Sequence, residues 1–81
     1  MTDKELRRAV RTVWEEVLGA DVDDDTDFFD AGGTSFAALR IVATLNSRHA
    51  IAISVKALFE NSRFTDFAAA VDQDPGLTRP A

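Results

Sequence analysis

Apolar residues recur along the first part of the chain at spacings of three and four, which is the repeat of an α-helix that buries one face. The first stripe predicts a helix over residues 3–18 that ends at Gly19. A second stripe predicts a helix over residues 35–48. The apolar positions are Leu6, Val10, Val13, Trp14, Val17 and Leu18 in the first helix, and Ala38, Ile41, Val42 and Leu45 in the second.

Two shorter elements are predicted in the last third of the chain. Ser54 can cap a brief helix and Ser62 can cap a last one, because serine is among the best N-cap residues. The β-branched run "IAIS" before Ser54 is compatible with a strand, but nothing nearby offers it a partner. Residues 74–81 contain both prolines and are expected to fray. The apolar positions are Val55, Leu58 and Phe59 in the brief helix, and Phe64, Phe67, Ala68 and Val71 in the last one.

The connection between the first two helices, residues 19–34, is long for a compact domain, and long connections tend to be functional. Val22, Phe28 and Phe29 are expected to anchor it to the core. The fold class predicted for the chain is therefore all-α, a single domain in which three main helices and one short helix form a four-helix bundle.

Size and composition narrow the class of protein. A chain of 81 residues makes one domain with a modest core. It contains no cysteine, which excludes disulfides and thiolate metal sites. No apolar run is long enough to span a bilayer, and the start "MTDKELRR" is too polar for a secretory signal. We expect a cytoplasmic, monomeric protein.

Negative charge is concentrated upstream of the second helix. The chain has nine basic and fourteen acidic residues. Such a field repels nucleic acid and anionic membranes and attracts basic protein surfaces, although it is equally typical of a solvated loop. No basic residue lies within residues 19–34, which hold the aspartates Asp21, Asp23, Asp24, Asp25, Asp27 and Asp30.

These aspartates do not fit a calcium-binding loop. A loop that starts at Asp21 would need glycine at its sixth position and a carboxylate at its twelfth, where the chain has Thr26 and Gly32. A start at Asp23 places Phe28 at the glycine position. No metal site is predicted.

Ser35, which follows two glycines in "GGTSF", is the residue with the most distinctive chemistry. As a nucleophile it would need a general base, and the only histidine is His49. An unbroken helix would separate the two by roughly 21 Å. The motif also lacks the second glycine of the hydrolase elbow, and no lysine follows the glycines as in a phosphate loop. Catalysis by Ser35 is therefore not expected.

Two interpretations of Ser35 remain. It can be the N-cap of the second helix, although Thr34 could cap equally well. It can instead be an attachment point, because a helix N-terminus favours the negative charge of a phosphodiester. The paired glycines would then clear space for an enzyme, and Phe36 and Leu39 would offer it apolar contacts.

The stretch "DDDTDFFDAGGTSFAALRIVATLN" resembles the attachment motif of peptidyl carrier proteins, the thiolation domains of nonribosomal peptide synthetases. The family pattern is approximately D-x-F-F-x-x-G-G-x-S-L, followed by an amphipathic helix. Downstream, "VKALFENSRFTDFAAAV" is similar to the family's short and final helices, so that the resemblance covers almost the whole chain. The matching residues are Asp27, Phe28, Phe29, Gly32, Gly33 and Ser35.

The resemblance implies a non-catalytic carrier. Ser35 would receive 4′-phosphopantetheine from coenzyme A through a separate, magnesium-dependent phosphopantetheinyl transferase. The thiol of this arm would hold an aminoacyl or peptidyl group as a thioester during nonribosomal peptide, including antibiotic, biosynthesis. An adenylation enzyme would load it, and condensation, tailoring or thioesterase enzymes would act on it.

Candidate recognition residues flank this serine. They are Phe36 and Leu39 on the second helix and Val55 and Lys56 on the short one, with ordinary packing as the alternative. Thr34 belongs to the supporting motif around the site.

The motif departs from the family pattern at several positions. Thr34 stands where many relatives have His or Asp, Phe36 replaces Leu, and Ala31 replaces a frequent Leu. Ser62-Arg63 replaces a frequent Pro-Thr before the last helix. The changes beside Ser35 leave the identity of the partners open.

Two other functions remain alternatives. Acyl carriers of fatty acid and polyketide synthesis usually have an acidic residue, Ser and Leu in place of "GGTSF", which favours the peptidyl type here. A cofactor-free helical module could instead bind a basic partner through the aspartate-rich loop. The carrier is expected to be free-standing, with a module excised from a larger synthetase as the alternative.

Overall fold

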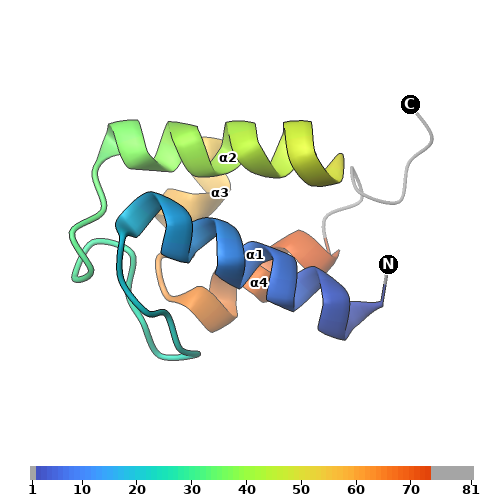
Figure 1. Cartoon of the computed structure of the whole chain (residues 1–81), viewed down its shortest axis with the longest axis horizontal. Helices are drawn as coiled ribbons and strands as arrows, with labels where there is room; N and C mark the ends of the chain where they lie inside the picture. Colours follow the sequence, from blue (N-terminus) through green and yellow to red (C-terminus); the bar gives the residue numbers. More distant parts are fainter. Residues whose placement is uncertain (1, 74–81) are drawn as a thin grey trace.

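The computed structural model describes residues 2–73, and these residues form four helices and no strand. α1 packs against α2 and α4, and α3 packs against the same two helices, as can be followed in Figure 1. The predicted all-α bundle of three main helices and one short helix is confirmed. The tail that was expected to fray, residues 74–81, lies outside the described residues. The helices are α1 (Asp3–Leu18), α2 (Ser35–His49), α3 (Val55–Glu60) and α4 (Phe64–Gln73).

Both ends of α1 are fixed by local interactions. Thr2 Oγ1 accepts a hydrogen bond from the Glu5 amide at 3.2 Å, and the Glu5 carboxylate accepts one from the Thr2 amide, which makes a capping box. Gly19 ends the helix in the left-handed conformation, with φ at 69°. The predicted bounds of this helix are confirmed.

The core is centred on Trp14, which is fully buried. The centroid of its ring lies 5.7 Å from that of Phe28, 5.4 Å from that of Phe64 and 5.7 Å from that of Phe67. The pairs with Phe28 and Phe64 are edge-to-face and the pair with Phe67 is tilted, and aromatic pairs at these separations add to the stabilisation that comes from burying their area. Phe28 comes from the α1–α2 connection, so the connection contributes directly to the core. Val17 and Leu18, predicted on the buried stripe, are only partly buried.

The segment before α3 is extended but is not a strand of a sheet. Ile51 and Ile53 are buried while Ala52 and Ser54 are exposed, as expected for an extended chain that alternates between two faces. Among residues 2–73 the only β-type pairing is an isolated bridge between Asp27 and Arg63. Ser54 caps α3 as predicted, since its hydroxyl accepts a hydrogen bond from the Ala57 amide at 3.1 Å.

Candidate functional site

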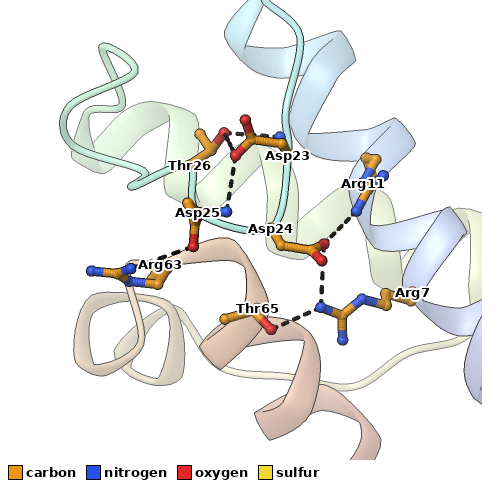
Figure 2. A network of polar contacts seen from close by, with 8 residues as sticks. All are labelled: Arg7, Arg11, Asp23, Asp24, Asp25, Thr26, Arg63 and Thr65. Carbon is orange, nitrogen blue, oxygen red and sulfur yellow. Dashed lines mark hydrogen bonds and ion pairs between the residues drawn. The ribbon is translucent and has the colours of Figure 1, made fainter.

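The α1–α2 connection is held to the bundle by an ion-pair network, shown in Figure 2. Asp24 Oδ1 lies 2.6 Å from Arg11 Nη2 and 3.3 Å from Arg7 Nη2, both on α1. Arg7 Nη2 also donates to the Thr65 hydroxyl of α4 at 2.7 Å. Both guanidinium groups lie over the ring of Phe64, at 5.7 Å and 5.0 Å from its centroid. The network therefore joins the connection to two helices at once.

Other aspartates of the connection have structural partners as well. Asp25 forms an ion pair with Arg63 at 3.6 Å. The Asp23 carboxylate accepts a hydrogen bond from the Asp25 amide at 2.9 Å, and the Thr26 hydroxyl accepts one from the Asp23 amide at 2.9 Å. Asp24 and Asp25 are exposed, as expected of a solvated loop, and each also forms an ion pair with an arginine of the bundle.

Asp27 begins a hydrogen-bonded turn that leads into the glycine pair. Its Oδ2 accepts hydrogen bonds from the amides of Phe29 and Asp30, at 3.0 Å and 3.1 Å. The turn closes with the Gly33 amide donating to the Phe28 carbonyl and the Gly32 amide donating to the Phe29 carbonyl. These two hydrogen bonds, made around a residue in the left-handed conformation, form a Schellman motif. Gly32 supplies that residue with φ at 92°.

Gly33 is required for a different reason, which is close packing against Phe28. A Cβ atom at this position would lie 2.5 Å from Cε2 and Cζ of the buried Phe28 ring. Gly33 does not have a positive φ, so the restriction comes from volume and not from backbone conformation. The hypothesis that the glycines mainly clear space for an enzyme is not needed, because the fold itself accounts for both.

Asp27 also ties the turn to the α3–α4 connection. Ser62 Oγ donates to Asp27 Oδ1 at 2.6 Å, and the Phe28 amide donates to the Ser62 carbonyl at 2.7 Å. The hydrogen bond from Ser62, together with the amide of Asp30, lowers the pKa of the Asp27 carboxyl below its usual value. The prediction that Ser62 caps the last helix is wrong: α4 begins at Phe64, and the Ser62 side chain is engaged by Asp27.

Thr34, and not Ser35, is the N-cap of α2. Its hydroxyl accepts a hydrogen bond from the Ala37 amide at 3.2 Å, and its backbone is extended, with φ at −122°. The alternative in which Ser35 is the cap is therefore wrong. Ser35 is the first residue of the helix, its side chain is exposed, and its hydroxyl makes no hydrogen bond to any residue from 2 to 73.

Apolar side chains are exposed around this serine. Phe36 is 71% exposed and Leu39 is 56% exposed, one helical turn apart on α2.

Phe29, expected as an anchor of the connection, is 48% exposed and stacks on Phe59 of α3 at a centroid distance of 5.9 Å. Only Val22 and Phe28 are buried anchors as predicted. In α3, the other two candidate recognition residues differ: Val55 is partly buried and Lys56 is exposed.

The surroundings of Ser35 fit an attached phosphodiester better than a catalytic serine. His49 is the last residue of α2 and Ser35 is the first, so the helix separates the hydroxyl from the single histidine of the chain. No acidic residue lies in the first turn of α2, whose amides and dipole favour a negative group there. The exposed hydroxyl has room for a bulky substituent.

The fold is that of the carrier proteins, which are small helical bundles, as two solved structures show. The solved structure of BlmI, a type-II acyl-carrier-protein from Streptomyces verticillus involved in bleomycin biosynthesis, superposes with a TM-score of 0.78 at 27% identity, over 86% of each chain. A solved non-ribosomal PCP domain gives a TM-score of 0.68 at 38% identity, over 85% of this chain and 87% of that one.

Comparison of the sequence with protein families identifies the family to which the chain belongs. The family model described as the phosphopantetheine attachment site matches residues 8–71, and the chain belongs to this family. The cofactor of the family is covalently attached 4′-phosphopantetheine.

Curated relatives include very large synthetases. Bacitracin synthase 1 from Bacillus licheniformis is 37% identical over 71 residues, or 86% of this chain. Nonribosomal peptide synthetase kk1B from Curvularia clavata is 30% identical over 76 residues, or 94% of this chain. The chain spans about 1% of the length of each of these relatives. No helix within the described residues is long and apolar enough to cross a membrane.

Sequence reasoning missed the residues that hold the site in place. Arg7 and Arg11 lie four apart on one helix face beside an aspartate-rich segment, which was a signal for ion pairing. Nothing in the sequence showed that Asp24, among the aspartates of the segment, would be the partner. The engagement of Ser62 by Asp27 joins residues 35 positions apart and had no local signal.

Proposed function

We propose that Ser35 is the residue to which 4′-phosphopantetheine is attached, and that the chain is a non-catalytic carrier. The observation that supports this most directly is the exposed, unengaged Ser35 hydroxyl at the first position of α2, in a chain that belongs to the phosphopantetheine attachment family. When bound, the arm supplies a thiol that holds an acyl group as a thioester.

In this proposal Ser35 is itself the substrate of another enzyme, and the residues around it hold its hydroxyl in an accessible position. Ser35 Oγ gives up its proton and forms the new bond to phosphorus, while the phosphoanhydride bond of coenzyme A breaks and adenosine 3′,5′-bisphosphate leaves. Within residues 2–73 no side chain hydrogen-bonds to the Ser35 hydroxyl, and the first turn of α2 has no acidic residue, so we assign the base to a phosphopantetheinyl transferase. Thr34 fixes the start of α2, and the free amides of the first turn face the new negative charge.

The cargo proposed is an aminoacyl or peptidyl group of nonribosomal peptide biosynthesis. This rests on the relatives, which are nonribosomal peptide synthetases, and on the non-ribosomal PCP domain at 38% identity. An acyl carrier is the second candidate, because the type-II acyl-carrier-protein BlmI superposes with the higher TM-score. The partners proposed are an adenylation enzyme and condensation, tailoring or thioesterase enzymes. A monomeric, cytoplasmic protein remains the prediction.

The partner enzymes are proposed to recognise the apolar face beside Ser35. Phe36 and Leu39 supply exposed apolar area on α2, and Lys56 supplies an exposed charge on α3. Val55 is partly buried, so its contribution is shared with packing of the bundle.

The test is the intact-protein mass before and after incubation with coenzyme A, magnesium and a broad-specificity phosphopantetheinyl transferase. The wild-type chain should gain one phosphopantetheine and Ser35→Ala none. Ser47→Ala is the matched control, because Ser47 is an exposed serine on the same helix, and it should be modified at the wild-type rate. No gain in the folded wild-type chain, with an active transferase, would favour the cofactor-free docking module.

A further inference from the structure

Ser62, in the α3–α4 connection, joins the backbone turn before Ser35 to the rest of the bundle. Within residues 2–73, it is the only residue outside this turn and α2 that hydrogen-bonds to residues 27–35. Ser62 Oγ donates to Asp27 Oδ1 at 2.6 Å, and the Phe28 amide donates to the Ser62 carbonyl at 2.7 Å. Only the first of these two bonds depends on the side chain of Ser62.

The turn itself, residues 27–33, is hydrogen-bonded throughout. Each backbone amide from 28 to 33 donates a hydrogen bond, at distances from 2.7 Å to 3.1 Å. The amides of Phe29 and Asp30 share one acceptor, which is Asp27 Oδ2. The Asp27 carboxylate therefore binds the turn through one oxygen and Ser62 through the other. Hydrogen bonds to an ionised carboxylate are stronger than those between neutral groups.

The orientation of the Asp27 carboxylate decides whether both of its oxygens can act in this way. Asp27 is half-buried, so without the Ser62 hydroxyl its carboxylate can rotate to another staggered rotamer and bind water. Such a rotation releases the amides of Phe29 and Asp30. The bond from the Phe28 amide to the Ser62 carbonyl and the buried Phe28 ring remain. Loss of the hydroxyl is therefore expected to loosen the turn without unfolding the bundle.

The turn leads directly to the attachment residue. Its last amide, that of Gly33, donates to the Phe28 carbonyl at 2.9 Å. Thr34 follows as the cap of α2, and Ser35 is the first residue of that helix. An enzyme that binds one conformation of this segment binds the chain more weakly in proportion to the fraction of molecules in other conformations.

Building on the proposed attachment at Ser35, we propose that Ser62 is a positioning residue for this reaction. By holding Asp27, it keeps the turn before Ser35 in the conformation that the phosphopantetheinyl transferase binds. Ser62 acts through Asp27 and does not touch the reacting atoms. The turn is already ordered in the free chain, so its conformational entropy is not lost again when the enzyme binds. The effect of Ser62 is therefore on KM for the carrier and not on kcat.

The experiment measures kcat and KM of the full chain with coenzyme A, magnesium and a broad-specificity phosphopantetheinyl transferase. Ser62→Ala should raise KM for the carrier about fivefold and leave kcat within about twofold of wild type. Ser62→Thr keeps the hydroxyl and should restore the wild-type KM. Circular dichroism establishes that each variant is folded.

Thr2→Ala is the matched control for a general loss of stability. It removes a hydroxyl that accepts a hydrogen bond at the N-cap of α1 and makes no contact with the turn. Loss of a cap destabilises a helix, yet KM and kcat should both stay within about twofold of wild type.

Amide hydrogen exchange followed by NMR supplies a second readout, because it reports the opening of each hydrogen bond separately. In Ser62→Ala, the amides of Phe29 and Asp30 should exchange faster than in wild type. The amides of Ile41 and Leu45, within α2, should exchange at the wild-type rate. This pattern would show that the turn loosens while the helix that carries Ser35 stays formed.

Four results would overturn the positioning role while attachment at Ser35 stands. They are an unchanged KM in Ser62→Ala, a loss confined to kcat, a rise in KM that Thr2→Ala reproduces or Ser62→Thr does not remove, and unchanged exchange at Phe29 and Asp30. A folded wild-type chain that gains no phosphopantetheine overturns the proposed function as well.

Discussion

Phe28 and Phe29 are neighbours in the sequence, yet the first is fully buried and the second is 48% exposed. They mark the boundary between an anchored segment, residues 22–28, and a presenting segment, residues 29–39. The anchored segment contributes Val22 and Phe28 to the core and Asp24 to the arginine network. The presenting segment exposes Ser35 with the apolar side chains around it.

The difference shows how a small bundle can expose Ser35 without losing order around it. An exposed segment buries little apolar area of its own, so its conformation must be fixed from its ends. Here one end is fixed by Asp27, which binds both the following amides and Ser62. Within the segment, the Thr34 cap fixes the start of α2, one residue before Ser35.

The largest expected effect separates the two phenylalanines. Phe28→Ala removes a fully buried ring that contacts Trp14, and should lower the free energy of unfolding by about 3–5 kcal/mol. Phe29→Ala removes a half-exposed ring and its stack on Phe59, and should cost about 1 kcal/mol. Urea unfolding followed by tryptophan fluorescence measures both. Equal losses in the two variants would contradict the division into an anchored and a presenting segment.

A smaller effect separates the two glycines. Gly33→Ala should lower the free energy of unfolding by about 1–3 kcal/mol, because the added methyl group overlaps the buried Phe28 ring. Gly32→Ala meets no atom within 4 Å and should cost only about 1 kcal/mol of backbone strain at its positive φ.

Asparagine distinguishes the two causes, because it tolerates a positive φ better than alanine does. Gly32→Asn should therefore be more stable than Gly32→Ala, while Gly33→Asn should be no better than Gly33→Ala. The same urea titration measures these variants, and a rescue by asparagine at Gly33 would show that volume is not the restriction there.

The smallest effect concerns Asp27 and is seen only in acid. Because the folded state lowers the pKa of Asp27 below 3.8, its contribution to stability is complete above that pH and is lost as the pH falls through the folded value. Ser62→Ala removes the first cause of this shift. As the pH is lowered from about 4 to about 2, the range in which Asp27 becomes protonated, the variant should lose less stability than wild type.

Thermal unfolding at several pH values, with the Asp27 carboxyl titration followed by NMR, measures this effect. Ser54→Ala is the control, since that serine caps α3 and does not contact Asp27. An unchanged Asp27 titration in Ser62→Ala would show that the amides of Phe29 and Asp30 alone set the pKa.

The sequence by itself determined most of the helices and the position of the candidate site. Stripes of apolar residues and the capping residues set α1 and α2 to within a residue or so, because helix formation depends on neighbours within one or two turns. The spacing of "DFFDAGGTS" located Ser35 before any contact was known.

Only the tertiary structure decided how that motif is used. Which phenylalanine is buried, why Gly33 has no side chain and what Ser62 binds depend on atoms brought together by packing. The Ser62–Asp27 bond joins positions 35 residues apart, and the Arg7–Thr65 bond joins positions 58 apart. Local periodicity carries no information on such pairs, because they form only when the helices close around Trp14.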